Sequence, residues 1–233
     1  MTSYGQAQVR GIMGPNLGLI AFYLEEQEGT TSTRNRTTAT FDPGSGFGWH
    51  AGGSVRLGND PIELEGSIIF IWQQVTAGYA RRDSWTIIAG YSATDKVGQY
   101  EDTYTLVEAP LQLSISATPS IRFAIGPSPW YLIAQNHRDH GVQTDRSSFQ
   151  GYQPTTSTST YDVRDRSRKG YSILGVSATV GMAVLTKKRI SFGLSTSISL
   201  TPIFPNKEPY AGHLSTVHFS VGYLFGQHST TDR

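Results

Sequence analysis

The feature that most constrains this chain is an alternation of apolar and small polar residues with a period of two. It is clearest over residues 216–225, where the odd positions are Val, Phe, Val, Tyr and Phe, and the even positions from 216 to 222 are Thr, His, Ser and Gly. Successive side chains of a β-strand point to opposite faces, so this pattern predicts a strand with one apolar face. The other face lacks the Lys and Glu of a solvent-exposed sheet, and its small residues suit a narrow barrel interior.

The same alternation recurs along the chain and predicts eight strands. An even number of antiparallel strands with apolar residues outward is typical of bacterial outer-membrane barrels. We therefore predict an all-β fold, an eight-stranded antiparallel up-and-down transmembrane β-barrel. A soluble lipocalin-like barrel is the alternative, and the count rises to ten if 85–91 and 97–103 span as a further pair instead of extending strands beyond the membrane. The expected strands are Val9–Leu24, Phe47–Leu57, Ile62–Gln74, Thr105–Ala117, Ile121–Ala134, Leu174–Val184, Ile190–Leu200 and Thr216–Phe225.

Short and long connections alternate between these strands. The short ones, at 58–61, 118–120 and 186–189, have strong turn chemistry. The long ones cover about 25–46, 75–104, 135–170 and 201–213, and are polar enough to be mobile on their own. Outer-membrane barrels have short periplasmic turns and long extracellular loops. We therefore expect a barrel over 9–225, with a periplasmic segment at 1–8 and a periplasmic tail at 226–233.

Composition and charge exclude several functional classes. Charged residues make up 16% of the chain and the net charge is +1, so no basic field attracts nucleic acid. The chain has no cysteine, which excludes disulfides and thiolate metal sites. The first eight residues contain no apolar signal segment, and we interpret the chain as a mature form. We expect it in the bacterial outer membrane, surrounded by outer-membrane lipid, with other envelope proteins as candidate partners.

Aromatic residues near the outer strand ends predict an interfacial girdle. These residues are Tyr23, Trp49, Trp72, Trp130 and Tyr131.

The alternation also places polar and charged residues inside the barrel. Buried charges must pair, because an isolated charge is costly in a low-dielectric interior. We therefore predict that the three arginines and three glutamates of this set form one network that closes the lumen. A polar core is the structural interpretation, and a gate or a proton-linked site is the functional alternative. The inward polar positions are Arg10, His50, Arg56, Glu63, Glu65, Glu108, Gln112, Arg122 and His218.

Other motifs give little support for chemistry, and we predict no catalytic residue, cofactor or metal. His218 and Ser220 share an inward face, but positions two apart on a strand are about 7 Å apart, too far for a nucleophile–base hydrogen bond. His137 and His140 lie in a long connection, where their spacing carries little information on metal binding. The basic run 164–169 lies near the outer end of the sixth expected strand. It is a candidate contact for anionic headgroups or a partner, and a solvated loop end is the alternative and the more usual role of such a run.

Several segments resemble the PorT-like outer-membrane barrel family of Bacteroidetes, which are small OmpA-type barrels. The resemblance lies in GIMGPNLG at 11–18, GFGWHAGG at 46–53, LVEAPL at 106–111, FAIGP at 123–127 and VGYLF at 221–225. It covers most of the expected strands but not the long links. It implies an eight-stranded barrel in the outer membrane, in a family whose namesake is tied to type IX secretion. One departure is that eight residues follow Phe225, where such barrels usually end on an aromatic residue.

The expected function is that of a non-enzymatic anchor, scaffold or accessory subunit of an envelope complex, acting through its outer links. A narrow pore or small-ligand carrier is one alternative, although eight strands leave an interior that side chains fill. A lipid-modifying barrel enzyme is the other.

Overall fold

A computed structural model describes residues 8–24, 34–59, 61–87, 90–207 and 210–225, and the described residues are organised in β-strands. Eight strand positions close into a ring, in which each position pairs antiparallel with the next. In ring order they are β1 (Gln8–Leu24), β3 (Gly44–Asn59), β4 (Ile62–Ile87), β5 (Gly90–Glu108) with its continuation β6 (Leu111–Ser116), β7 (Ile121–Phe149), β9 (Leu174–Leu185), β10 (Ile190–Ser199) and β12 (Tyr210–Phe225). The predicted fold class is therefore confirmed, with eight strands in the ring.

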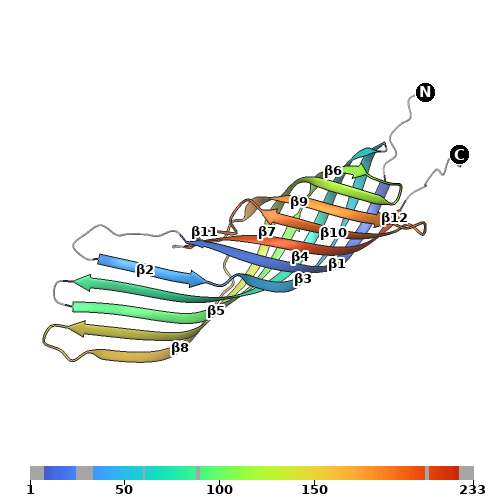
Figure 1. Ribbon diagram of the computed structural model, residues 1–233. Helices are drawn as coiled ribbons and strands as arrows, with labels where there is room; N and C mark the ends of the chain where they lie inside the picture. The colour runs from blue at the N-terminus through green and yellow to red at the C-terminus, as the bar shows by residue number, and fades with distance from the viewer. Residues whose placement is uncertain (1–7, 25–33, 60, 88–89, 208–209, 226–233) are drawn as a thin grey trace, which may run out of the picture.

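The first and last strands close the barrel. β1 pairs with β12 from Val9 opposite Phe225 to Leu24 opposite Tyr210. Its other edge pairs with β3, from Gln8 opposite Arg56 to Ile20 opposite Gly44. The start of β1 and the end of β12 thus lie at the same end of the barrel, where the three short turns also lie (Figure 1). The fourth ring position is interrupted at Ala109 and Pro110, between β5 and β6.

The outer surface of the barrel is an apolar band. Residues that alternate along each strand expose large side chains, such as Met13 on β1, Phe70 on β4 and Phe192 on β10, each more than half exposed. A protein surrounded by water rarely exposes apolar side chains around its whole circumference, whereas a protein that spans a lipid bilayer must do so. The described residues contain no helix that is long and apolar enough to cross a bilayer.

The long links are the main difference from the sequence-based expectation. β4, β5 and β7 continue far beyond the barrel rim, and β4 pairs with β5 up to Ile87 opposite Gly90. Two further strands flank them: β2 (Arg34–Phe41) pairs with β4, and β8 (Thr155–Asp165) pairs with β7. Figure 1 shows this sheet of β2, β4, β5, β7 and β8, hereafter the extension, projecting from one end of the barrel. The prediction of irregular, mobile loops was therefore wrong for most of 75–104 and 135–165. The alternative of ten strands is excluded, because these segments lengthen existing strands instead of adding a pair to the ring. The fourth link contains β11 (Phe204–Lys207), which pairs with β12.

Two glycines allow tyrosines to cross one face of the extension. One row of register partners crosses four strands of the extension. It consists of Tyr79 on β4, Gly98 on β5, Gly141 on β7 and Tyr161 on β8. The two tyrosine hydroxyls meet above the glycines, and the Tyr79 hydroxyl also donates to Asp139 Oδ1 at 2.8 Å. Burial and these hydrogen bonds raise the pKa of Tyr79 above its ordinary value, so the phenol stays neutral.

Replacing Gly141 by alanine is expected to loosen the extension. A Cβ atom at this position would lie 2.2 Å from the Val97 carbonyl oxygen and 2.5 Å from Gly98 Cα, and backbone atoms cannot move away cheaply. We expect limited proteolysis of the detergent-solubilised variant to cut the β7–β8 region faster than in the parent protein. Gly66→Ala is the control, because its Cβ would meet only Leu111 at an ordinary 3.7 Å. Equal cleavage rates for both variants would contradict this account.

Candidate functional site

Charged residues near the short-turn end of the lumen form a compact ion network. Arg10 Nη2 lies 2.6 Å from Glu65 Oε1, and Arg56 Nε lies 2.9 Å from Glu65 Oε2. Glu63 is shared in the same way, by Arg56 at 3.8 Å and by a direct contact with Arg122. These side chains come from β1, β3, β4 and β7 and extend into the lumen, so the network narrows it at this level.

Glu108 was predicted to join this network, and that part of the prediction was wrong. Its side chain is buried inside the barrel, but it accepts a hydrogen bond from Ser128 Oγ at 3.1 Å and forms no ion pair with the described residues. The reason is its position along the barrel axis. Glu108 lies opposite Ile69 of β4, which is four residues further along that strand than Glu65. Four residues along a strand cover about 13 Å. Gln112, in contrast, lies opposite Glu65.

Two histidines meet in the middle of the lumen. His50 of β3 and His218 of β12 are both buried, and their rings pack edge to face with centroids 4.9 Å apart. The Nδ1 atom of each ring lacks a hydrogen-bond partner in the described part of the chain. Buried polar atoms of this kind are usually satisfied by water.

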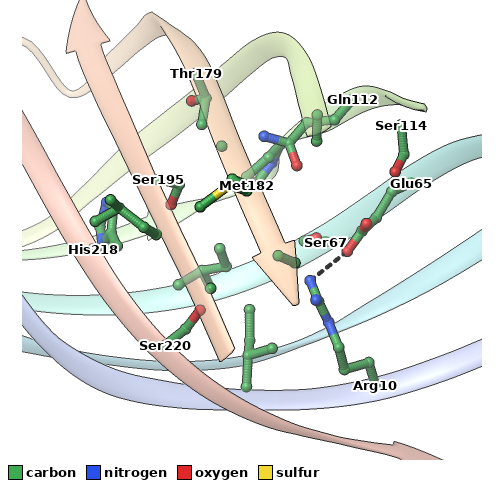
Figure 2. A pocket seen from close by; sticks show the side chains of 18 of the residues that line it. Arg10, Glu65, Ser67, Gln112, Ser114, Thr179, Met182, Ser195, His218 and Ser220 are labelled. Atoms are coloured by element: carbon green, nitrogen blue, oxygen red, sulfur yellow. Dashed lines mark hydrogen bonds and ion pairs between the residues drawn. The ribbon is translucent and has the colours of Figure 1, made fainter. Parts of the chain in front are cut away.

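A cavity of about 70 Å³ separates the ion network from the histidines. Figure 2 shows Arg10 and Glu65 joined at one side of it, with His218, Ser195 and Ser220 on the other. The cavity has room for a few water molecules, whereas sites for drug-sized ligands measure roughly 300–1,000 Å³. The described part of the lumen therefore contains a polar layer with room for water but not for a drug-sized ligand.

An apolar layer closes the lumen above the histidines, toward the extension. Leu132 and Tyr104 are completely buried, and Ile71 and Ile203 are 1% exposed. Sequence reasoning missed this layer because it took inward positions to be polar. The members of this cluster, hereafter the apolar layer, are Ile20, Ile71, Val75, Tyr104, Leu106, Trp130, Leu132, Tyr171, Ile203 and Leu214.

The predicted aromatic girdle divides into inward and outward residues. Trp49 and Trp72 lie opposite each other on β3 and β4 and are 64% and 44% exposed, and Tyr131 is 42% exposed. Trp130 was predicted to face lipid, which is wrong: it is 5% exposed and belongs to the apolar layer. Its parity on β7 is that of the inward Arg122, eight residues earlier. The side chain of Tyr23 lies outside the described residues.

Quenching by lipids brominated along their acyl chains should separate these tryptophans. In vesicles of such lipids, a variant that retains only Trp49 or only Trp72 is expected to lose most of its fluorescence, because bromine quenches on contact. A variant that retains only Trp130 is expected to keep its fluorescence, because its indole ring is inside the barrel. Strong quenching of Trp130 would place it on the lipid face and contradict the structure.

The remaining motifs do not assemble a reactive group. His137 Nδ1 lies 2.7 Å from Asp102 Oδ1, while His140, an odd number of residues away on the same strand, points to the other face of the extension. His218 and Ser220 both line the polar cavity, and no hydrogen bond joins them in the described part of the chain. A second buried polar cluster lies above the apolar layer, where the Tyr171 hydroxyl donates to Asp102 at 3.2 Å. Its partners are far apart in sequence, and of these residues only His137 belonged to a motif that the sequence analysis considered.

The closed ring, the apolar outer band and the buried polar interior define a transmembrane β-barrel of eight strands. No family model matches the sequence, and no curated protein matches it. Among solved structures, the chain is similar to the deltaS2 mutant of the monoaromatic hydrocarbon channel TodX, with 8% identity, 97% of this chain and 91% of that chain covered, and a TM-score of 0.23. It is also similar to the translocator domain of the autotransporter NalP from Neisseria meningitidis, with 11% identity, coverage of 93% and 88%, and a TM-score of 0.21. A FadL homologue from Pseudomonas aeruginosa has 7% identity, coverage of 95% and 90%, and a TM-score of 0.21. At these TM-scores the similarities say nothing about function, and the fold assignment rests on the strand pairing of this chain.

Proposed function

We propose that this protein is an outer-membrane scaffold that holds a rigid β-sheet outside the cell for recognition by an envelope or surface partner. The observation that carries the proposal is the continuity of β4, β5 and β7. Each of these strands is part of the barrel wall and then of the extension, and the pairing of β5 with β7 passes from one to the other through a single bulge at Thr105 and Leu106. A binding surface on such a sheet loses little conformational freedom on association, which favours affinity.

The closed lumen supports a scaffold over a pore. The ion network, the histidine pair and the apolar layer fill the cross-section at successive heights. A channel needs a continuous aqueous path, and an interior of eight strands is just wide enough for side chains. Planar-bilayer recordings of the purified protein are expected to show no stable conductance. Reproducible unitary currents would favour the pore.

A role without catalysis is part of this proposal. The cavity lined by His218 and Ser220 lies inside the barrel, between the ion network and the apolar layer. A lipid substrate approaching from the membrane would have to cross the barrel wall to reach them. Ser220→Ala is therefore expected to leave the lipid A profile of the cell unchanged, and an altered profile on mass spectrometry would favour the enzyme alternative.

Photo-crosslinking in intact cells tests the scaffold directly. A photoreactive amino acid at Thr158, on the exposed strand β8, is expected to form a discrete adduct with one partner protein. The same amino acid at Lys188, in a short turn at the opposite end, is the control and is expected not to capture that partner. If no position on the extension gives a discrete adduct, the scaffold proposal fails.

A relationship to the PorT-like family and a role as accessory subunit of a secretion complex belong to the same proposal. They are supported by the strand motifs, and by the eight-stranded barrel that the family implies. Purification of the full chain from native membranes in mild detergent is expected to bring down a stoichiometric envelope complex. Recovery of the chain alone would argue against the subunit role.

A further inference from the structure

The outer boundary of the apolar band can be located on three neighbouring strands. On β4 and β7 the continuous apolar band of the barrel ends at Trp72 and Ile133, both at least 40% exposed. Further along this face, beyond several polar rows, Val97 and Val142 form a separate exposed pair. The next outward row consists of Gln74, Thr103 and Asn136, which lie side by side in the strand register. The change from tryptophan and isoleucine to amides and a hydroxyl marks the level at which lipid tails give way to headgroups.

A polar hollow of about 240 Å³ begins at this boundary row, on the outer face of the extension. The row above it contributes Glu101, Arg138 and Arg164, which are register neighbours on β5, β7 and β8. Arg166, just beyond the end of β8, completes the lining. The hollow thus combines three arginines with amide and hydroxyl groups at headgroup level.

The acidic residues near the hollow are already paired with one of these arginines. Arg138 donates two hydrogen bonds of 3.0 Å to the two carboxylate oxygens of Asp162, and its Nη1 lies 3.4 Å from Glu101 Oε2. The hydrogen bonds with Asp162 raise the pKa of Arg138, and those from Arg138 lower the pKa of Asp162.

Arg164 and Arg166 remain to act on a ligand. Arg164 is 65% exposed, and its Nε lies 3.9 Å from Asp162, beyond hydrogen-bond distance. Arg166 is exposed and forms no ion pair with any residue that the structure describes. Three arginines against two carboxylates leave the hollow with one excess positive charge.

The basic run 164–169 is held at the outer boundary of the apolar band. Arg168 Nη1 donates to the Tyr131 hydroxyl at 3.3 Å and to the Leu132 carbonyl oxygen at 3.1 Å. Since Tyr131 belongs to the outward aromatic residues, this contact ties the segment that follows β8 to the membrane boundary. The arginines are therefore held beside headgroups, not carried on a free loop.

We propose that this hollow binds the phosphate group of an outer-leaflet lipid, with Arg164 and Arg166 pairing with the phosphate and Asn136 and Thr103 donating hydrogen bonds. Arginine suits this role because its planar guanidinium forms paired, charge-assisted hydrogen bonds with phosphate oxygens. The acyl chains of such a lipid would lie along the apolar band directly below. The assignment to the outer leaflet rests on the proposed orientation of the barrel, whereas recognition of the phosphate does not.

Native mass spectrometry of the full chain in non-ionic detergent tests the proposal. The probes are lipid A with its phosphates, the same lipid A after enzymatic dephosphorylation, and inorganic phosphate. We expect the protein to retain phosphorylated lipid A and to lose the dephosphorylated form. We expect the double variant Arg164→Gln/Arg166→Gln to reduce the bound fraction on the order of tenfold, because it removes both guanidinium groups that pair with the phosphate.

The matched control is Arg36→Gln/Arg146→Gln. It removes the same charge from exposed arginines on the same face of the extension, but Arg146 lies eight residues, about 26 Å, beyond Arg138 along β7. This control is expected to bind like the parent protein. Equal retention of dephosphorylated lipid A, equal binding by the Arg164→Gln/Arg166→Gln variant, or full displacement by equimolar inorganic phosphate would each overturn the proposal. Because the assay is done in detergent, its failure leaves the scaffold proposal and its crosslinking test unaffected.

Discussion

Replacing Glu65 by alanine is expected to lower the free energy of unfolding by about 3–5 kcal/mol, the usual cost of removing one partner from a buried ion pair. Glu65 is 3% exposed and holds two arginines, Arg10 and Arg56. Without it, three interior arginines share the single carboxylate of Glu63. Reversible urea unfolding of the protein from lipid vesicles, followed by tryptophan fluorescence, measures the change.

Asp95→Ala is the control for this prediction. Asp95 also lies near two arginines, Arg82 at 3.6 Å and Arg146 at 3.8 Å, but on the extension and in contact with solvent. Exposed pairs contribute about 0–1 kcal/mol, so this variant is expected to unfold almost like the parent protein. If Glu65→Ala and Asp95→Ala lowered the free energy of unfolding by similar amounts, the ion network inside the barrel would be as exposed to water as the surface pairs.

Replacing Leu132 by alanine is the second large change that we expect, at about 2–5 kcal/mol. Leu132 is completely buried in the apolar layer. Its truncation removes transfer free energy and also leaves a cavity, because the surrounding strands are fixed by their ladders. The same vesicle-based urea titration gives the value.

Leu113→Ala separates these two contributions. Leu113 is 45% exposed on the outer face of β6. Its truncation loses about 2 kcal/mol of transfer free energy, but lipid chains fill the gap, so no cavity remains. Leu132→Ala is therefore expected to be the more damaging variant. If the two variants lose equal stability, the apolar layer is not packed as a protein core.

The barrel could be predicted because successive side chains of each strand alternate between lipid and the interior, so their hydropathy alternates as well. The inward parity of Arg122 and the outward parity of Phe123 persist along β7 as far as Leu132, and a bulge beyond it shifts the parity so that Gln135 faces inward. That parity also places Trp130 inside, so the sequence contained the signal that the girdle prediction overlooked. Glu108 shows the limit of parity, which gives the face of a strand but not the height at which two strands bring side chains together.

β8, the edge strand of the extension, was harder to predict because both of its faces are polar. β8 alternates Thr and Ser on its two sides, so hydropathy has no period to detect. The high content of Thr, a β-branched residue, was the available signal for strand structure. The phosphate site was equally hidden, because Asn136, Arg138, Arg164 and Arg166 are brought together only by the pairing of β7 with β8.

Labelling of single cysteines in intact cells tests the central claim, a closed outer-membrane barrel whose extension faces outward. The chain has no cysteine, so each introduced thiol reports one position. With a membrane-impermeant maleimide, Thr158→Cys on β8 is expected to label in intact cells, and Lys188→Cys in the short turn only after the outer membrane is permeabilised. Labelling of Lys188→Cys but not Thr158→Cys in intact cells, or of neither after permeabilisation, would contradict the account.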